Sequence, residues 1–277
     1  MNAIYYKNPQ MALIRKLIKT EKNEDVYPFT VKSIKNLNIL DLNNDIIILV
    51  GGNGSGKSTM LEIIATKLNL YRISEDLNYS DIEFETIKKA VNGFDIQYLT
   101  KPKGFFFRSE DFITYIKYLD KEKQIAAEEL KRIDQEYKGK SALSKGLAKM
   151  PYVRTISEIE DMYQINLNEQ SHGESYLDFF KSRLRPNSLY LLDEAEMPLS
   201  INNQLALMLM IKEAIDMGCQ FIIATHSPVL MSYPNSLIYQ IDDEGFKTTT
   251  YEDIESVSLL KDFLNNKDRF LNHLFKE

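Results

Sequence analysis

The stretch Gly51-Gly-Asn-Gly-Ser-Gly-Lys-Ser-Thr59 decides the fold of this chain. Its four glycines let the backbone bend so that several N–H groups point inward at one anion. Residues 46–50 before it are wholly apolar, as expected of a parallel strand buried on both faces. The apolar residues between positions 61 and 68 recur at helical spacing. A strand, a glycine loop and a helix in this order direct the helix N-terminus at a phosphate.

From Gly51 to Ser58 the stretch fits G-x-x-x-x-G-K-[ST], the pattern of a P-loop. Lys57 is expected to reach the β- and γ-phosphates of a nucleotide, and the Ser58 hydroxyl to ligate Mg²⁺. The alternative is a glycine-rich turn without a ligand, which the strand and the helix on either side argue against. The predicted nucleotide-binding residues are Gly51, Asn53, Gly54, Ser55, Gly56, Lys57, Ser58 and Thr59.

The composition of the 277 residues is that of an ordinary soluble globular protein, with 44% apolar and 27% charged residues. Its net charge of −6 gives no overall attraction to nucleic acid or anionic lipid, although a local patch can still act. No apolar run approaches the length of a membrane span, and the N-terminus lacks a signal peptide. The single Cys219 fits a reducing compartment. We therefore expect a cytoplasmic protein.

The predicted fold class is α/β: one domain over residues 1–277 with a mostly parallel sheet flanked by helices. Residues 1–26 are expected to be an N-terminal extension, in which residues 11–19 have the spacing of a short basic helix. Its cations either contact an anionic partner or form a solvated face, and the solvated face is favoured. Residues 29–34 alternate apolar and polar and predict an extended segment. Tyr27 or Phe29 either stacks on an adenine ring or packs in the core.

A helical lobe is expected over residues 111–185. Residues 111–138 form one long helical pattern of on the order of 40 Å, an arm too short for a pair of long coiled-coil arms. Residues 139–157 contain four cations and no acid. They predict a solvated loop, with contact to nucleic acid or an anionic partner as the alternative. Ser109 is a plausible N-cap for the long helix.

Alternating strands and helices are predicted for the rest of the chain. Strands are expected at 105–107, 189–192 and 221–224, a hairpin at 237–241 and 246–250, and helices at 174–185, from Ser200 to Gly218, and over 253–275.

Two acids follow the predicted strand at 189–192. Asp193 emerges at the end of a buried strand, where a ligand crevice forms in an open α/β sheet, and there it can hold Mg²⁺. Glu194, one residue later, can face the γ-phosphate and polarise the attacking water. Two adjacent carboxylates are a weak signal alone but a stronger one beside a P-loop, because phosphoryl transfer needs a metal anchor and a group that positions the nucleophile.

His226 follows the next apolar strand, and its imidazole can hydrogen-bond the γ-phosphate and orient Glu194. A hydrolase triad of Ser227, His226 and Asp193 is the rival interpretation. It is disfavoured because adjacent side chains of an extended segment point to opposite faces, and because no G-x-S-x-G elbow is present. With three widely spaced histidines, no zinc site is supported.

The P-loop, the acidic strand end and the histidine, in this order, resemble an ABC-type ATPase domain. Such a domain has a signature loop before a helix, and Ser171-His-Gly-Glu-Ser175 stands about twenty residues before Asp193. It departs from Leu-Ser-Gly-Gly-Gln but keeps a serine and a glycine two apart. The resemblance implies that Ser171 and the Gly173 backbone bind the γ-phosphate of a nucleotide held by a second subunit, which suits a helix N-terminus. Glu174 belongs to the same signature, which acts in trans.

Residues 192–200, Leu-Asp-Glu-Ala-Glu-Met-Pro-Leu-Ser, resemble the Walker B and D-loop run of small stand-alone ATPases. These are often catalogued as predicted AAA-family ATPases, though they are ABC-like and akin to the heads of SMC and RecF proteins. Residues 105–112 and 262–271 also look like that group. In place of the Q-loop glutamine, for which Gln97 is poorly positioned, residues 109–110 are the candidates.

The resemblance implies that the chain binds Mg-ATP and hydrolyses it as an ATP-dependent, head-to-tail homodimer. Three outputs stay open. The first is a cytosolic switch in DNA maintenance or phage defence, with a partner nuclease or DNA. The second is the nucleotide-binding subunit of a membrane transporter, and the third is a passive nucleotide sensor with negligible turnover. The Ser-His-Gly-Glu-Ser loop and the long helix favour the first.

Overall fold

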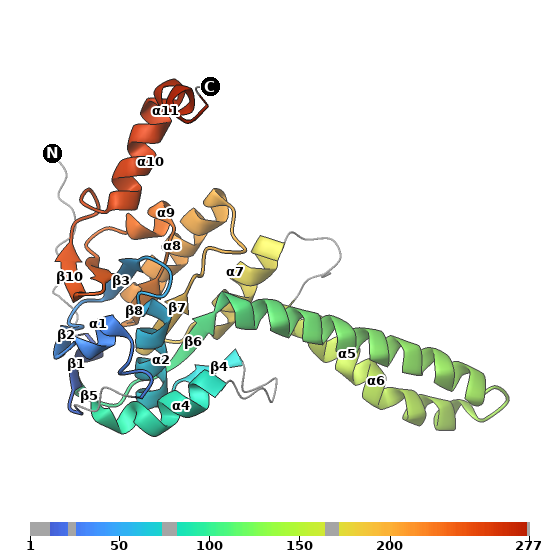
Figure 1. Cartoon of the computed structure of the whole chain (residues 1–277). Helices are drawn as coiled ribbons and strands as arrows, with labels where there is room; N and C mark the ends of the chain where they lie inside the picture. Colours follow the sequence, from blue (N-terminus) through green and yellow to red (C-terminus); the bar gives the residue numbers. More distant parts are fainter. Residues whose placement is uncertain (1–11, 22–25, 74–81, 164–171, 276–277) are drawn as a thin grey trace.

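The computed structural model describes residues 12–21, 26–73, 82–163 and 172–275 and shows the predicted α/β architecture (Figure 1). The main sheet has seven strands. In spatial order they are β10 (Gly245–Thr249), β9 (Leu237–Asp242), β3 (Ile46–Gly51), β8 (Gln220–Ala224), β7 (Ser188–Asp193), β6 (Lys103–Arg108) and β4 (Tyr71–Arg72). Only β10 is antiparallel to its neighbour, as the predicted hairpin requires. The mostly parallel sheet is therefore confirmed.

A second, antiparallel sheet has the order β2 (Ile39–Asp41), β1 (Ile14–Lys19) and β5 (Phe94–Tyr98). The helices are α1 (Lys32–Lys35), α2 (Lys57–Leu68), α4 (Ile82–Ala90), α5 (Ser109–Glu136), α6 (Ala142–Tyr163), α7 (His172–Arg183), α8 (Ile201–Asp216), α9 (Pro228–Met231), α10 (Glu255–Asn265) and α11 (Lys267–Leu274). None of the helices formed by the described residues is long and apolar enough to cross a membrane.

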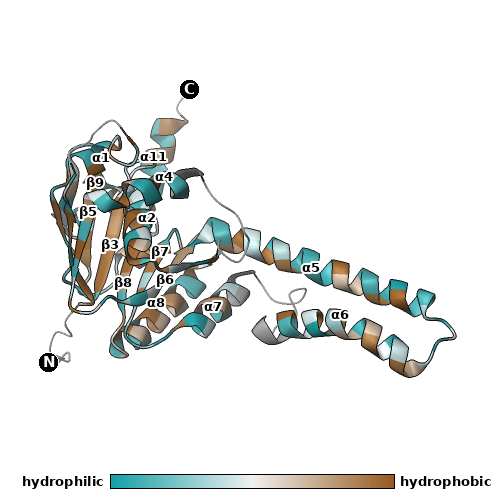
Figure 2. Ribbon diagram, turned by 90° about the horizontal axis from the view of Figure 1, so that it is seen from below, coloured by the Kyte–Doolittle hydropathy of each residue, from teal (hydrophilic) through white to brown (hydrophobic). Residues whose placement is uncertain are grey.

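The central strand β3 divides the core into two layers, and it is almost wholly hydrophobic in Figure 2. Because side chains alternate along a strand, Ile46, Ile48 and Val50 join the cluster on the face covered by α7 and α8. Ile47 and Leu49 join the cluster on the opposite face, with α2 and the small sheet. Burial of both faces explains why the strand has no polar residue.

The helix predicted over residues 11–19 is wrong, because residues 14–19 form β1 in the middle of the small sheet. Ile14 and Leu17 are fully buried there, and the buried Gln220 amide bonds both the N–H and the carbonyl of Ile14. Strand pairing thus overrides a local helical spacing. This part of the predicted N-terminal extension lies within a sheet.

The extended segment predicted over residues 29–34 is also wrong. The chain turns there and enters the short helix α1. Phe29 is 3% exposed and stacks on Phe94, with ring centroids 5.2 Å apart, so core packing is its role. Tyr27 instead places its hydroxyl 3.2 Å from Thr59 Oγ1 at the start of α2.

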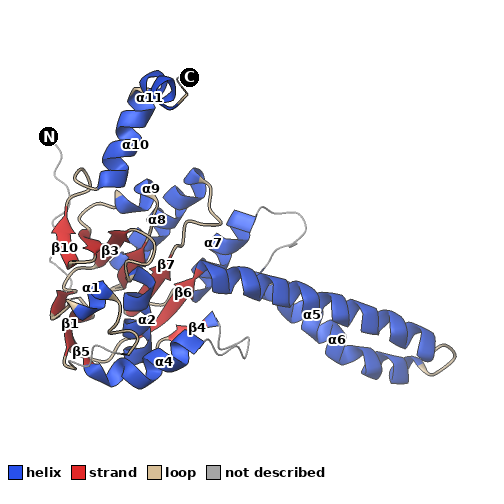
Figure 3. Ribbon diagram, in the orientation of Figure 1, coloured by secondary structure: helices blue, strands red, loops and turns tan. Residues whose placement is uncertain are grey.

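Helices α5 and α6 form a hairpin that projects from the body as an arm (Figures 1 and 3). The long helix is confirmed, but residues 142–157 are helical and the predicted loop is wrong. Ser141 caps α6 by accepting a bond from Ser144 N, and Lys145 and Lys149 pair with Asp134 of α5 at 2.6 and 2.7 Å. The acid that balances this basic stretch therefore lies on the other helix.

The C-terminal half follows the prediction closely. Ser200 caps α8 by accepting a bond from Asn203 N, and Gly218 follows α8 with a left-handed φ of 87°. The hairpin β9–β10 and two tail helices, α10 and α11, complete the chain. Ser109, in contrast, is the first residue of α5 rather than its N-cap, which is Arg108.

Candidate nucleotide-binding and hydrolysis site

The glycine loop joins the end of β3 to the start of α2. Gly54 and Gly56 have φ of +75° and +101°, where other residues are strained. A Cβ on Gly56 would lie 2.5 Å from Ser33 Oγ. The Ser33 hydroxyl donates to the carbonyl of Ser55 at 2.5 Å, so α1 braces the loop from outside. Sequence reasoning missed Ser33, because no P-loop pattern contains a residue so far upstream.

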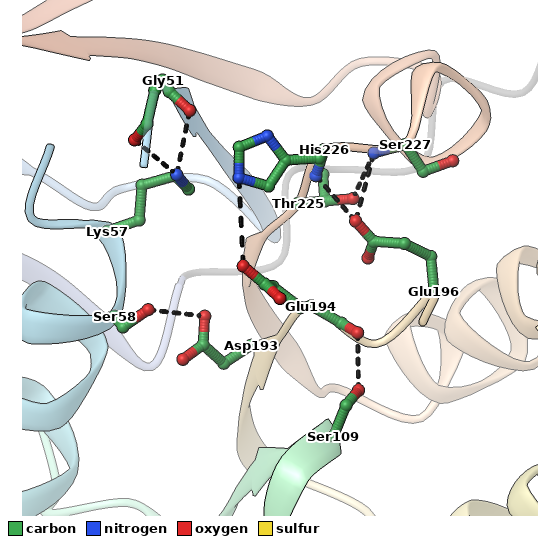
Figure 4. A network of polar contacts seen from close by, with 11 residues as sticks. Gly51, Lys57, Ser58, Ser109, Asp193, Glu194, Glu196, Thr225, His226 and Ser227 are labelled. Carbon is green, nitrogen blue, oxygen red and sulfur yellow. Dashed lines mark hydrogen bonds and ion pairs between the residues drawn. The ribbon is translucent and has the colours of Figure 1, made fainter. Parts of the chain in front are cut away.

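The loop is shaped for an anion. Lys57 is 5% exposed, and its amine donates to the carbonyls of Gly51 and Gly52 at 2.9 and 3.0 Å (Figure 4). An ammonium has three donors, so one remains for a phosphate oxygen. The Ser55 hydroxyl is buried in the same loop and has no hydrogen-bond partner among the described residues, as a phosphate-binding donor would be. Burial lowers the pKa of Lys57, and Glu194, Asp193 and Glu196 oppose that shift.

Ser58 and Asp193, the residues predicted to bind magnesium, lie side by side. Strand β3, which leads into the glycine loop and Ser58, and strand β7, which ends at Asp193, both neighbour β8 in one parallel sheet, so the two residues come to the same edge. Ser58 Oγ donates to Asp193 Oδ1 at 3.1 Å. Hydroxyl and carboxylate oxygens suit Mg²⁺, which keeps several waters and binds phosphate oxygens as its other ligands. In the described parts of the chain, no group of three His, Cys, Asp or Glu side chains could hold a metal. The predicted magnesium site does not require such a group, because its protein ligands would be one carboxylate and one hydroxyl.

Burial raises the pKa of Asp193 to about 6, although Ser58 and Arg108 stabilise the carboxylate. A raised pKa means that the folded protein favours the protonated form. The protonated Asp193 side chain therefore contributes to the free energy of unfolding. This contribution is fully present below pH 3.8, the pKa in the unfolded chain, and is lost as the pH rises through about 6, the pKa in the folded protein. At neutral pH without metal, the Asp193 charge therefore costs stability, by on the order of 3 kcal/mol at most.

We expect Asp193→Asn to raise the Tm of the metal-free protein by several degrees at pH 7.5, because the neutral amide avoids that cost. The same variant should lose the stabilisation that Mg-ATP confers on the wild type. Differential scanning fluorimetry in EDTA and in Mg-ATP measures both effects. Asp120→Asn, on the exposed face of α5, is the control and should leave both Tm values unchanged. A lower Tm for Asp193→Asn in EDTA would contradict the prediction.

Glu194 has a backbone conformation that few side chains adopt, with φ of +51°. Two bonds hold it: its N–H donates to the carbonyl of Ala224 at 2.9 Å, and its carbonyl accepts from Ser109 Oγ at 2.5 Å. The side chain is 37% exposed at the open edge, where Glu194 Oε1 lies 3.9 Å from His226 Nε2. Such strained residues, held by their surroundings, cluster at functional sites.

Ser109 connects the site to α7. Besides donating to Glu194, its hydroxyl opposes the rise that burial causes in the pKa of Tyr176, a residue that is 1% exposed on α7. Sequence reasoning named residues 109–110 for the Q-loop role, and β6 does place Ser109 beside β7. Gln97 lies in β5 of the small sheet, opposite Lys16. The link between Ser109, Tyr176 and the Glu194 backbone was not foreseen, because it joins three segments distant in sequence.

We expect Ser109→Ala to lower kcat for ATP about tenfold while KM changes little, because the Glu194 carbonyl loses a partly buried hydrogen bond of roughly 1–2 kcal/mol. Steady-state phosphate release tests this. Thr114→Ala is the matched control, since it removes an exposed hydroxyl from the same helix. An unchanged kcat for Ser109→Ala would show that the left-handed Glu194 backbone is held without this bond.

A third acid, Glu196, positions the loop that carries the histidine. Its Oε1 accepts bonds from the backbone N–H groups of His226 and Ser227, at 2.6 and 3.1 Å. Ser227 Oγ donates to Gln204 Oε1 at 2.5 Å and is buried, so it is no nucleophile and the triad interpretation is excluded. Sequence reasoning missed Glu196, although its spacing from Asp193 was a visible signal.

The structure thus brings Lys57, Ser58, Asp193, Glu194 and His226 to one edge of the sheet (Figure 4). Gly173 and Glu174 lie in the first turn of α7, and their side-chain environment is not described. Ser171 lies outside the described residues. The role of this segment in a second subunit stays a prediction.

A mostly parallel sheet with a P-loop, an acidic strand end and a histidine at one edge, beside a small antiparallel sheet, defines an ABC-type ATPase domain. A family model described as ABC transporter matches residues 34–196, which is more than half of the chain. The chain therefore belongs to the ABC transporter family. The matched segment contains the P-loop, Asp193 and Glu194 and ends at Glu196.

Solved structures of low sequence identity are similar to this chain. One is MJ1267, an ATP-binding cassette of an ABC transporter in its ADP conformation, with a TM-score of 0.46, 15% identity, and coverage of 93% of this chain and 96% of that one. Another is the Smc head domain of Pyrococcus furiosus bound to the C-terminal domain of ScpA, with a TM-score of 0.44, 15% identity, and coverage of 91% and 99%. No curated protein sequence matches the chain.

Proposed function

We propose that this protein binds Mg-ATP at the edge formed by the P-loop, β7 and β8, and hydrolyses it to ADP and phosphate. The observation that carries the proposal is the convergence of three predicted pieces from distant segments. Ser58 is bonded to Asp193, and His226 lies 3.9 Å from Glu194, whose backbone is held in place at both its N–H and its carbonyl.

Each side chain has a role that its surroundings support. Lys57 and the loop N–H groups bind the β- and γ-phosphates, and Ser58 and Asp193 hold Mg²⁺, which when bound neutralises charge on the phosphates. Glu194 accepts a hydrogen bond from the attacking water and polarises it. His226 orients Glu194 and donates to the γ-phosphate, and Glu196 fixes the loop that carries the imidazole.

Phosphate release measured with purified protein tests the proposal. We expect release that requires both ATP and Mg²⁺ and stops on addition of EDTA. Turnover no higher than that of a Lys57→Ala preparation would favour the passive nucleotide sensor instead.

The second part of the proposal is an ATP-dependent, head-to-tail homodimer with C₂ symmetry, in which Ser171, Gly173 and Glu174 of each subunit complete the other's site. The position of Gly173 and Glu174 in the first turn of α7 supports it, because helix N-terminal N–H groups bind phosphate well. Tyr176, one turn further on, would connect this helix to Ser109 and so to Glu194.

We further propose a cytoplasmic switch that serves DNA maintenance or phage defence through DNA or a partner effector such as a nuclease. The arm supports this choice: α5 begins at Ser109, which contacts the Glu194 backbone, and projects away from the body. The alternative, a transporter's nucleotide-binding subunit, is favoured by the family description. DNA-stimulated phosphate release supports the switch, whereas copurification with a membrane protein supports the alternative.

A further inference from the structure

A cavity lies at the edge of the main sheet opposite the candidate nucleotide site. The neighbouring parallel strands β4, β6 and β7 all begin there, whereas the nucleotide site lies where β3, β7 and β8 end. Its volume is about 570 Å³, which lies in the range of small-molecule pockets. The walls come mainly from residues 100–105 and 183–190, with Leu13 and Tyr71.

The pocket is strongly cationic. Lys101, Lys103, Arg183 and Arg185 line it, and none of the lining residues, all of which lie in the described parts of the chain, is acidic. Two basic segments about 80 positions apart meet here because β6 and β7 pair in parallel, with Lys103 opposite Ser188. On a chain of net charge −6, four cations without an acid form a local positive potential that attracts anions.

The two arginines are held in place. Arg185 Nη1 donates to the carbonyls of Ser182 and Leu184 at 3.0 and 2.7 Å. The Arg183 guanidinium lies 3.5 Å from the centroid of the Phe179 ring. Since a guanidinium has five N–H donors, these contacts fix each group and leave donors for a ligand. Capping of the end of α7 would explain the two arginines. It does not explain the two lysines, which lie at the start of β6 and just before it and line the same cavity.

Tyr71 adds an aromatic wall. Its ring stacks on Phe105, with centroids 5.5 Å apart and planes 20° from parallel, and the residue is 39% exposed. Phe105 is buried behind it. A half-exposed ring beside cations is a surface on which a nucleobase stacks while its phosphates meet the cations.

We propose that this pocket binds a nucleotide-sized ligand that carries at least two phosphate groups, separately from the P-loop. Four cations can balance the charge of such a ligand. Their confinement in one cavity, rather than along a stripe, favours a small ligand over a length of nucleic acid. The pocket shares α7 with the hydrolysis site, through Arg183 at one end and Tyr176 near the other.

Isothermal titration of the full-length protein with pyrophosphate and with ADP tests the proposal. The Lys57→Ala substitution weakens binding at the P-loop. In this variant we therefore expect one saturable binding event to remain, at the cationic pocket. Lys101→Glu combined with Lys103→Glu should weaken that event at least tenfold; both side chains are exposed, so the fold is expected to persist. Arg185→Gln, in a second variant, should weaken it as well.

Lys121→Glu combined with Lys131→Glu is the matched control, since it reverses two exposed charges on the arm. Absence of a saturable event in Lys57→Ala, or equal weakening by the control pair, would overturn the proposal. A 5′-phosphorylated oligonucleotide that bound more than tenfold tighter than ADP and competed with it would identify nucleic acid as the occupant and also overturn it. The test measures binding only, so its result is independent of ATP hydrolysis.

Discussion

Lys57→Ala is expected to reduce the affinity for ATP at least about 100-fold. The ammonium is buried in the loop beside the expected position of the β- and γ-phosphates, and charge-assisted hydrogen bonds of this kind contribute roughly 1.5–3 kcal/mol each. The truncation also removes the two bonds to Gly51 and Gly52, which help to keep the loop closed on the phosphates. Isothermal titration with ATP in the presence of Mg²⁺ measures the change.

Lys67→Ala is the control for this substitution. It lies in the last turn of the same helix and pairs with Asp95 at 3.4 Å, away from the loop. It should retain the wild-type affinity for ATP. If Lys57→Ala bound ATP as tightly as Lys67→Ala, the assignment of the glycine loop as the nucleotide site would fail. Circular dichroism of both variants distinguishes lost binding from lost folding.

The parts of the fold that the sequence predicted correctly are those whose signals are local. β3 is an unbroken apolar run, Ser200 supplies its own cap to α8, and Gly218 adopts the left-handed conformation its position suggested. In each case the residues that stabilise the element lie within it or at its ends. Such signals are readable without knowing the tertiary structure.

The errors occur where stabilisation comes from elsewhere in the chain. Residues 14–19 have helical spacing, but Gln220, more than 200 positions away, bonds Ile14 within a sheet. The helix α6 contains a basic stretch that looks like a loop until Asp134 of α5 is placed opposite Lys145 and Lys149. Long-range pairing of this kind has no signature in a single sequence window.

The candidate site shows the same division. The residues predicted to touch nucleotide, metal or water stand next to glycines or at strand ends, so their positions in the sequence single them out, and their roles stay predictions. Ser33, Ser109 and Glu196 were missed in their observed roles, because each bonds a backbone group of another segment: Ser55, Glu194 and the His226 loop. Any hydroxyl or carboxylate can do this, so residue type gives little indication of it.

Glu194→Gln is expected to lower phosphate release at least about 100-fold and to leave ATP binding intact. A glutamine amide is nearly the same size as the carboxylate but cannot take up a proton, and loss of a general base costs about 10²–10⁴ in rate. The bonds that hold this residue, from Ser109 and to Ala224, involve its backbone only, so the substitution should not disturb the loop. Phosphate release and ATP titration measure the two properties.

Because ATP stays bound and is not hydrolysed, the Glu194→Gln variant should also accumulate as the homodimer. Light scattering should show twice the monomer mass with Mg-ATP and the monomer mass with ADP. Glu213→Gln, exposed on α8, is the matched control and should keep wild-type turnover. If Glu194→Gln hydrolysed ATP slowly but stayed monomeric at saturating ATP, the proposed dimer would be wrong, and Glu194 would remain the general base. If the variant hydrolysed ATP at the wild-type rate, the assignment of Glu194 as the general base would be wrong. The two outcomes are separable because the base is supplied within one subunit, whereas Ser171, Gly173 and Glu174 would act on the nucleotide of another.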